Sequence, residues 1–393
     1  MKILYVTTAP TPKKPNASAF IQRRLEQIEK QKETQGLEYD VLYPAVEYSP
    51  FLKFILRTFK NYNVFDTYPH KYELNNIVYR YITKKMGLID FLQNYYRSYE
   101  WFEKIIPDEV DLSSYDLIHA HFAFPNGIIA KNLHLKYGIP YVLTLHGTDI
   151  HTLPYKSEQL KKEIVESLEN ASCCIFVSDF LRKEAVNLGY SGKNAVVIPN
   201  GFDPEVFYYE KKDSAKEKMG FKEKYLVGYV GNLIDVKNVM LLPKIFNQIQ
   251  EQNHNTNFVI IGEGNLDEPL KKSCFEERVD VRFTGSIPQN EVADYMRAMD
   301  IMILPSKNEG FGAVVVEAQA CGVYVIGSNV GGIPEAVGSV GRVFSVNDEF
   351  LSNVSDYSVG ILNNGIDIEA MLKRIKNFTW EKIIKDEFEL YKL

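Results

Sequence analysis

The sequence predicts an α/β protein of two domains, each built on a doubly wound parallel sheet. At 393 residues the chain is longer than one ordinary domain, and its 45% of hydrophobic residues can supply two cores. Short apolar strands alternate with helical stretches in both halves, which is typical of βαβ units. A charged, Lys-rich stretch at residues 209–224 separates the halves and is expected to be a linker.

The alternation also places the individual elements. In the first half we expect a helix at Ser18–Gln31 and strands at Ile3–Thr7, Tyr39–Tyr43, Leu117–Ala120, Tyr141–Leu145, Cys174–Ser178 and Ala195–Pro199. In the second half we expect strands at Leu226–Val230, Phe258–Gly262, Val279–Thr284, Ile301–Pro305 and Tyr324–Ser328. The first domain then covers residues 1–205 and the second 206–377. Two such domains form a cleft between the carboxyl ends of their sheets, where proteins of this class bind ligands.

One segment of the first domain, residues 51–102, has a character of its own. It is rich in aromatic residues, and residues 51–85 contain seven Lys or Arg against two acidic residues. A helical face there could touch anionic lipid, or it could belong to helices packed on the first domain; we favour packing, because a stripe of this length is more often core. The face combines apolar Phe51, Leu52, Ile55, Leu56 and Phe59 with basic Lys53, Arg57 and Lys60.

Composition excludes several classes of protein. The net charge of −6 gives no general attraction to nucleic acid, and no zinc-ligand spacing, Walker loop or basic recognition helix is present. Cys173, Cys174, Cys274 and Cys321 lack metal-type spacing, which suits a reducing compartment. The first residues form a strand directly, and no segment reaches about 18 consecutive apolar residues. We therefore expect a cytoplasmic protein without a nucleic-acid partner.

The most informative stretch is residues 305–318, where two carboxylates flank a glycine turn. A strand ending at Pro305, a glycine-containing loop and a helix beginning near Ala313 would present free backbone N–H groups and a positive dipole end. Such an arrangement binds phosphate. Glu309 in the loop and Glu317 one turn inside the helix could accept hydrogen bonds from vicinal hydroxyls, as in a sugar and a ribose.

The spacing of Glu309 and Glu317 resembles the Glu-x7-Glu motif of glycosyltransferase family 4. Further motifs follow the order of that family: His146-Gly147-Thr148-Asp149, Pro199-Asn200-Gly201-Phe202-Asp203, Gly231-Asn232-Leu233 with Lys237, Gly262-Glu263-Gly264, Phe283-Thr284-Gly285 and Gly331-Gly332-Ile333-Pro334-Glu335. The resemblance implies a GT-B fold, two Rossmann-like domains facing across a cleft, with a terminal helix at residues 378–393 packed back on the first domain. It also implies a retaining transferase that uses a nucleotide-diphosphate sugar.

The resemblance further implies the donor site. Glu317 would hold the ribose, Glu309 would contact the transferred sugar, and Lys237 would neutralise the diphosphate and the growing charge on the leaving group. The remaining donor positions are the loop and helix start at Gly310, Phe311, Gly312 and Ala313, together with Asn232, Gly264 and Ile287. Asn232 stands where the family usually has an Arg, and Lys307 and Arg342 are candidates to replace that charge. No Asp-x-Asp motif is present, so neither a metal nor another cofactor is expected.

Histidines of the first domain are expected to face the cleft, with His119, His121, Asp149, Asn16 and Ser18 at its acceptor side. His146 follows a strand, and the resemblance implies that it contacts the donor sugar and, with Glu309 and Lys237, supports catalysis by positioning rather than as a base. His119 and His121 point to the same face by strand alternation and could meet the acceptor or be buried structure. Asp149 would cap a helix or orient His146. Asn16 and Ser18 stand where relatives often carry a glycine pair.

The motifs also suggest a pathway class. Residues 144–151 and 188–194 most resemble bacterial enzymes that build exopolysaccharide, capsule or teichuronic-acid-type polymers. We therefore expect transfer of a hexose or N-acetylhexosamine, from a UDP-sugar, to a saccharide acceptor linked to lipid at the cytoplasmic membrane face. The alternatives are a transferase with a small soluble acceptor, a non-catalytic protein that binds sugar nucleotides, and an epimerase of the same fold.

Overall fold

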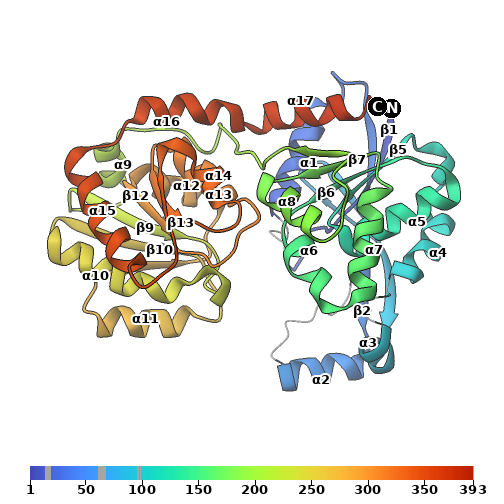
Figure 1. Ribbon diagram of the computed structural model, residues 1–393, viewed down its shortest axis with the longest axis horizontal. Helices are drawn as coiled ribbons and strands as arrows, with labels where there is room; N and C mark the ends of the chain where they lie inside the picture. Colours follow the sequence, from blue (N-terminus) through green and yellow to red (C-terminus); the bar gives the residue numbers. More distant parts are fainter. Residues whose placement is uncertain (14–18, 61–67, 95–96, 98, 393) are drawn as a thin grey trace. The chain divides into compact units, whose positions relative to one another are not determined.

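The computed structural model describes residues 1–13, 19–60, 68–94, 97 and 99–392. The chain divides into two compact units (Figure 1). The first unit contains residues 1–198 and 384–393, and the second contains residues 199–383. Asn16 and Ser18, which were predicted at the acceptor side, lie outside the described residues.

The first unit has an eight-stranded sheet in the order β3-β4-β2-β1-β5-β6-β7-β8. All neighbours are parallel except the edge pair β3 and β4. The strands are β1 Lys2–Val6, β2 Glu38–Tyr48, β3 Lys71–Leu74, β4 Ile77–Met86, β5 Leu117–His121, β6 Tyr141–Leu145, β7 Cys173–Phe176 and β8 Ala195–Val197. The strand order reverses between β1 and β5, and ligands bind at such reversals in open α/β sheets.

Helices cover both faces of this sheet (Figure 1). They are α1 Ala19–Gln31, α2 Pro50–Lys60, α3 Leu88–Asn94, α4 Tyr99–Glu109, α5 Ile128–Tyr137, α6 Thr148–His151, α7 Glu158–Glu169, α8 Asp179–Asn187 and the end of α17, Trp380–Leu390. Arg24 of α1 and Glu387 of α17 form a buried ion pair on one face. On the opposite face, α5 lies between α4 and α7.

The second unit has a six-stranded, fully parallel sheet in the order β11-β10-β9-β12-β13-β14. The strands are β9 Tyr225–Val230, β10 Thr256–Ile261, β11 Val281–Gly285, β12 Ile301–Leu304, β13 Tyr324–Ser328 and β14 Arg342–Phe344. The helices are α9 Lys212–Lys218, α10 Leu242–Gln252, α11 Asp267–Glu276, α12 Gln289–Ala298, α13 Ala313–Ala320, α14 Ile333–Val337, α15 Phe350–Asn364 and α16 Ile368–Ile375. Here the strand order reverses between β9 and β12.

Two segments differ from the sequence-based expectation. Helices alone were expected in residues 51–102, but this segment also supplies β3 and β4, which extend the sheet. Ile77–Met86 alternates buried and exposed side chains over its first half, which is the period of a strand. The expected linker at residues 209–224 contains α9, which packs on α12. The Lys216 ammonium is buried there and lies 2.8 Å from the Asp300 carboxylate, so this segment is part of the second unit.

Residues 199–205 also make their contacts within the second unit. The Phe202 N–H donates to the Phe378 carbonyl at 2.9 Å, and the Trp380 N–H donates to the Phe202 carbonyl at 3.0 Å. A Cβ on Gly201 would lie 2.9 Å from the Trp380 ring, so only glycine fits against that indole. These contacts place the change of unit just after β8, and helix α17 begins in the second unit and ends in the first.

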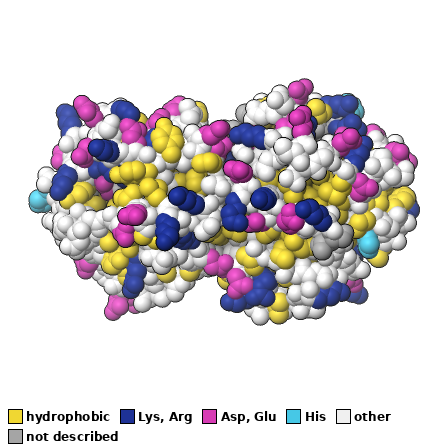
Figure 2. All heavy atoms as spheres, turned by 90° about the horizontal axis from the view of Figure 1, so that it is seen from above, with side chains coloured by type: hydrophobic (Ala, Val, Ile, Leu, Met, Phe, Trp, Pro, Cys, Tyr) yellow, Lys and Arg dark blue, Asp and Glu magenta, His cyan; other side chains and the backbone are white. Residues whose placement is uncertain are grey.

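The four cysteines lie in the interior, beneath a surface of mixed charge (Figure 2). All four cysteines are buried and carry free thiols. On the face drawn in Figure 2, basic and acidic side chains are intermixed on each unit. No helix within the described ranges is long and apolar enough to cross a membrane.

Candidate active site

Three histidines lie together at the carboxyl ends of β5 and β6 in the first unit. The rings of His119 and His121 stack with centroids 4.6 Å apart, and those of His121 and His146 stack at 5.3 Å. His121 Nδ1 lies 3.0 Å from His146 Nε2, which is hydrogen-bond distance. The first two side chains share a face because they are two residues apart on one strand. The structure therefore brings together the three histidines that the sequence singled out.

His119 is tied to the C-terminal helix by a buried hydrogen-bond network. The Tyr391 hydroxyl donates to Glu387 Oε1 at 2.5 Å, so its oxygen must accept from His119 Nδ1, which lies 2.6 Å away. His119 Nε2 then carries no proton and accepts from the Thr144 hydroxyl at 2.7 Å. His119, His121 and Glu387 are fully buried. The geometry thus makes His119 a neutral imidazole with both nitrogens occupied.

Burial lowers the pKa of all three rings. The pKa of His119 falls to about 4, because desolvation outweighs the Glu387 charge, which acts to raise it. The pKa values of His121 and His146 fall well below their usual range, because desolvation acts together with the charges of Arg24 and the neighbouring histidines. Neutral imidazoles donate or accept hydrogen bonds without attracting phosphate. His121 Nε2 and His146 Nδ1 are buried and have no hydrogen-bond partner in the described part of the chain.

Asp149 organises the backbone around His146. Its carboxylate is fully buried and accepts hydrogen bonds from the N–H groups of Gly147 at 2.7 Å, His146 at 3.2 Å and Ala123 at 3.2 Å. Burial raises its pKa, while these hydrogen bonds act in the opposite direction. Asp149 therefore holds the loops after β5 and β6 together, in the orienting role that the sequence analysis considered.

Aromatic rings surround His146. Phe20 and Phe122 place their ring centroids 4.8 and 4.7 Å from the imidazole. Phe122 has a φ of 69°, a left-handed conformation that costs a non-glycine residue about 1–2 kcal/mol. Packing around the loop compensates for this cost. The Phe20 and Phe122 rings form an apolar wall beside the neutral His146 imidazole.

In the second unit, Lys237 and Glu309 meet at the reversal point of the sheet. Lys237 lies in the loop after β9 and Glu309 in the loop after β12, and these strands are neighbours. The Lys237 ammonium pairs with Glu309 Oε1, which also accepts from the Ser306 hydroxyl at 3.1 Å. Both charged side chains are mostly buried. A partly desolvated ion pair at this position is a ready partner for an anionic ligand.

Glycines hold the loops of this site in close contact. Gly332 N–H donates to the Glu309 carbonyl at 3.0 Å, and a Cβ on Gly331 would lie 2.3 Å from that oxygen. A Cβ on Gly264 would lie 2.2 Å from the Leu233 carbonyl. The glycine motifs are therefore needed for backbone contact between loops, which no side chain would permit.

The loop after Glu309 leads into α13. Gly312, with a φ of 87°, precedes the first helical residue Ala313, so the free N–H groups of the helix start lie directly after the glycine turn. Phe311 is buried and stacks on Phe378 with ring centroids 6.2 Å apart. Glu317 is nearly buried on the second turn, and Gln289 Nε2 lies 3.4 Å from its Oε1.

The other predicted donor positions are more exposed. Asn232 is exposed, and its carbonyl accepts from the Tyr229 hydroxyl at 3.0 Å; Gly264 is exposed and Ile287 is half-buried. Of the two candidates for the missing charge, Lys307 pairs with Asp235 at 2.8 Å, beside the Lys237 loop. Arg342 instead packs over the Phe344 and Tyr357 rings at β14, two strands from the Glu309 loop.

Sequence reasoning missed the residues that support these groups. Ser306 and Gln289 contact Glu309 and Glu317, while Thr144, Glu387 and Tyr391 support His119. Ser306 could have been found from its place directly after an apolar strand. Glu387 and Tyr391 lie more than 260 residues from His119 in the sequence, and no local pattern connects them.

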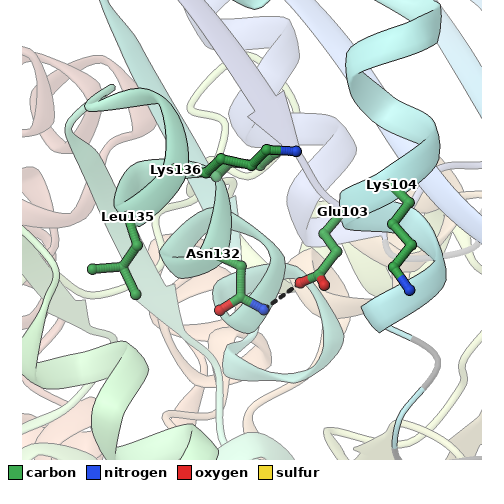
Figure 3. Close-up of a pocket in the computed structure, with 6 residues that line it drawn as sticks. Glu103, Lys104, Asn132, Leu135 and Lys136 are labelled. Atoms are coloured by element: carbon green, nitrogen blue, oxygen red, sulfur yellow. Dashed lines mark hydrogen bonds between the residues drawn. The ribbon is translucent and has the colours of Figure 1, made fainter.

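A separate pocket in the first unit lies between α4 and α5 (Figure 3). Its lining includes Glu103 and Lys104 of α4 and Asn132, Leu135 and Lys136 of α5, and the Asn132 amide donates to Glu103 at 2.5 Å. Leu135 and Lys136 belong to the C-terminal half of α5, and Asn132 lies at its middle. A helix that connects parallel strands runs back along the sheet, so this pocket lies toward the edge opposite the histidines.

Comparison with known proteins agrees with this geometry. The sequence profile of the group 1 glycosyl transferases matches residues 211–352, and that of glycosyltransferase family 4 matches residues 21–206. TuaC of Bacillus subtilis, a glycosyltransferase named for teichuronic acid biosynthesis, is 31% identical over 343 residues, which cover 86% of this chain and 83% of TuaC. The N-acetyl-alpha-D-glucosaminyl L-malate synthase of Bacillus anthracis is 31% identical over 277 residues, covering 68% of this chain and 70% of that enzyme.

Solved structures of the same fold match the whole chain. Sucrose-phosphate synthase of Thermosynechococcus elongatus superposes with a TM-score of 0.75 at 18% identity, covering 100% of this chain and 98% of that one. HepE of Anabaena in complex with UDP superposes with a TM-score of 0.73 at 19% identity, covering 100% of both chains. The chain therefore belongs to the group 1 glycosyltransferases of family 4, and it has their GT-B fold of two Rossmann-like domains.

Proposed function

We propose that this protein is a retaining, metal-independent glycosyltransferase that moves a hexose or N-acetylhexosamine from a UDP-sugar to a saccharide acceptor in bacterial surface polysaccharide synthesis. The observation that carries the proposal is the Lys237–Glu309 pair beside the start of α13. A compact cation and free helix N–H groups are what a diphosphate needs. No metal ion or other cofactor is part of the proposal.

The relatives support the donor and the pathway. HepE has been solved with UDP, with UDP and glucose, and with UDP-glucose. TuaC is named for teichuronic acid biosynthesis, and an O-antigen chain mannosyltransferase B of Escherichia coli is 26% identical over 272 residues. Together they favour a nucleotide-sugar donor and a polymer of the bacterial surface.

The charges of the second unit suggest how the donor binds. In the structure, the Glu309 carboxylate pairs with the Lys237 ammonium and neutralises its charge. We propose that the diphosphate replaces Glu309 as the ionic partner of the Lys237 ammonium. The Glu309 carboxylate can then accept hydrogen bonds from the transferred sugar. Glu317, held near Gln289, accepts from the ribose hydroxyls. The backbone of Gly310, Phe311 and Gly312 and the start of α13 at Ala313 then contact phosphate and sugar.

In this scheme the protein forms no covalent bond with the transferred sugar. The bond from the anomeric carbon to the phosphate oxygen breaks, and the acceptor hydroxyl attacks from the same face. Its proton passes to the departing phosphate oxygen, so UDP leaves and the configuration is retained. Lys237 stabilises the charge that grows on UDP, and neutral His146 contacts the sugar. His121 and Asp149 are positioning residues in this scheme, because they hold His146 and its loop.

The acceptor has two candidates. We favour a lipid-linked saccharide at the cytoplasmic membrane face, which is the acceptor that the motif resemblance implies. The match to TuaC, named for teichuronic acid biosynthesis, covers more of the chain than the match to the N-acetyl-alpha-D-glucosaminyl L-malate synthase, which supports a saccharide acceptor. That synthase nevertheless supports a small soluble acceptor as the second candidate, since its name specifies L-malate.

The deciding experiment measures nucleotide release from a panel of UDP-, GDP- and ADP-sugars in the presence of EDTA, with and without a membrane lipid extract. We expect one donor to be consumed, and Glu309→Ala and Lys237→Ala to lower kcat/KM about 100-fold or more. Lys272→Ala is the matched control, because this lysine is exposed on α11 and pairs with exposed Glu276. Absence of turnover and of binding for every donor would rule out the enzyme and leave a non-catalytic protein.

A further inference from the structure

The first unit carries a projecting arm that the donor site does not use. Strand β1 ends at Val6, which pairs with Leu42, whereas β2 continues to Tyr48 and stays paired with β4 up to Met86. Helix α2 follows β2, and α3 follows β4. We define the arm as residues 43–60 and 81–92; Figure 1 shows α2 and α3 together at its end.

The arm has a small core of its own. Leu52 and Leu56 of α2 and Met86 of β4 are buried together. The partly buried side chains packed against them are Val46, Tyr48, Leu88, Phe91 and Trp101. The Ser49 N–H donates to the Met86 carbonyl at 2.9 Å, which ties the two sides of the arm. The arm is thus a packed structure, and its inward hydrophobic side chains have partners.

Each helix also turns a second apolar strip outward. Phe51 and Phe54 of α2 are 63% and 65% exposed, and Ile89 and Leu92 of α3 are 70% and 72% exposed. The members of each pair are three residues apart, so they lie side by side on the helix surface. These four are the majority of the seven described large hydrophobic side chains that exceed 60% exposure. Such a concentration marks an interaction surface.

The charges around these strips are mainly basic. Arg57 of α2 and Lys84 and Lys85 at the end of β4 are exposed, and α2 contains no acidic residue. Two nearby acids accept hydrogen bonds from backbone groups: Asp90 accepts from the Gly87 N–H at 3.4 Å, and Glu47 accepts from the Tyr68 N–H at 2.9 Å. Exposed apolar side chains beside Lys and Arg match an anionic lipid surface, which takes both.

We infer that the arm docks the protein on an anionic membrane, with Phe51, Phe54, Ile89 and Leu92 inserted at the headgroup level and the basic side chains against lipid phosphates. This inference deepens the proposed function, because a lipid-linked acceptor resides in that membrane. A second copy of this chain would be expected to offer acidic groups to the same cations, and it is an outcome of the test below.

The test is co-sedimentation of the full chain with vesicles of phosphatidylcholine alone or mixed with phosphatidylglycerol. We expect binding to the anionic vesicles only, weakening with salt. Phe51→Ser with Phe54→Ser, and separately Lys84→Glu with Lys85→Glu, should each lower the partition coefficient about tenfold or more. Phe275→Ser with Lys272→Glu is the matched control, because both residues are exposed on α11 of the second unit.

Two readouts distinguish the possible failures. Thermal unfolding and donor hydrolysis should be unchanged in the arm variants, because the arm shares no residue with the donor site. Vesicle binding by a wild-type protein that consumes no donor would leave the docking surface standing without the proposed function. Equal binding by wild type and arm variants, or no vesicle binding at all, overturns the inference. A wild-type dimer by light scattering that becomes monomeric in the phenylalanine variant assigns the surface to a second copy and also overturns it.

Discussion

At the scale of single residues, the three stacked histidines show how burial selects a chemical state. Two stacked pairs with centroids 4.6 and 5.3 Å apart leave no room for water between rings, so a proton on one ring would be poorly solvated. Spacing along β5 could predict that His119 and His121 share a face. It could not predict that both are fully buried, because burial depends on helices far away in the sequence.

The depressed pKa of His119 makes stability depend on pH. Its folded pKa of about 4 lies below the ordinary histidine value of 6.5, so its contribution to stability is present above pH 6.5 and is lost as pH falls toward 4. Between pH 7.5 and pH 5 we expect wild type to lose about 2 kcal/mol more unfolding free energy than His119→Gln. Urea titrations at both pH values measure this, and equal losses in the two proteins would contradict it.

Replacing glycine by alanine should have opposite effects on stability at Gly331, in the donor site, and at Gly360, in α15. Gly331→Ala places a Cβ 2.3 Å from the Glu309 carbonyl at a φ of +58°, so we expect a cost of at least about 1–2 kcal/mol and a shifted Glu309 with lower donor turnover. Gly360→Ala in α15 meets no atom within 4 Å and should stabilise by about 0.5–1 kcal/mol. Thermal melts and donor assays of both variants test the contrast, which fails if both behave alike.

At the scale of elements, α17 shows how the end of the chain supports the first unit. Glu387 is fully buried and pairs with Arg24 at 3.4 Å, while its other oxygen accepts from Tyr391. Removing one member of a buried ion pair leaves the other charge uncompensated. We expect Glu387→Ala to cost about 3–5 kcal/mol of unfolding free energy.

The matched control for this prediction lies two residues away on the same helix, about half a turn round it. Glu389 is 60% exposed and contacts Lys392, so Glu389→Ala should change stability by less than about 0.5 kcal/mol. Urea unfolding at pH 7.5 compares the two variants. A small effect of Glu387→Ala would mean that the Arg24 charge finds another partner in the native state.

Several elements could be predicted because their patterns are local. The strand Tyr141–Leu145 has the bounds expected, and Ala313 begins α13 as the glycine loop suggested. The strands β3 and β4 could not be recognised among the aromatic residues of 51–102, because aromatics are common in both core helices and strands. Helix α9 was expected to be a linker because it is rich in charged lysines. One of them, Lys216, is buried because its ammonium pairs with Asp300, which lies 84 residues away in the sequence.

At the scale of the whole molecule, the chain separates its chemistry between two units. The cation and both glutamates of the donor site lie in residues 199–383, and the histidines lie in residues 1–198. If UDP is bound by the second unit, hydrogen exchange should slow in residues 231–237, 262–264 and 306–317. At about 100 times its Kd, UDP should stabilise that unit by about 2.7 kcal/mol.

Exchange measured by mass spectrometry with and without UDP checks this expectation peptide by peptide. Peptides from α2 and α3 serve as the internal control, since the arm has no donor residue. Protection confined to residues 119–149 would place the nucleotide in the first unit and would contradict the assignment of Lys237, Glu309 and Glu317.

Local patterns in the sequence were sufficient to predict the fold class, the family and the loops that carry Lys237, Glu309 and His146. Those features depend on short-range patterns: strand periodicity, glycine turns and motif order. Tertiary structure alone decided that Lys237 pairs with Glu309, that Glu387 and Tyr391 fix the state of His119, and that residues 43–60 and 81–92 form an arm with exposed hydrophobic strips. Each of these depends on which distant segments become neighbours in a sheet or core, and packing over the whole chain sets that outcome.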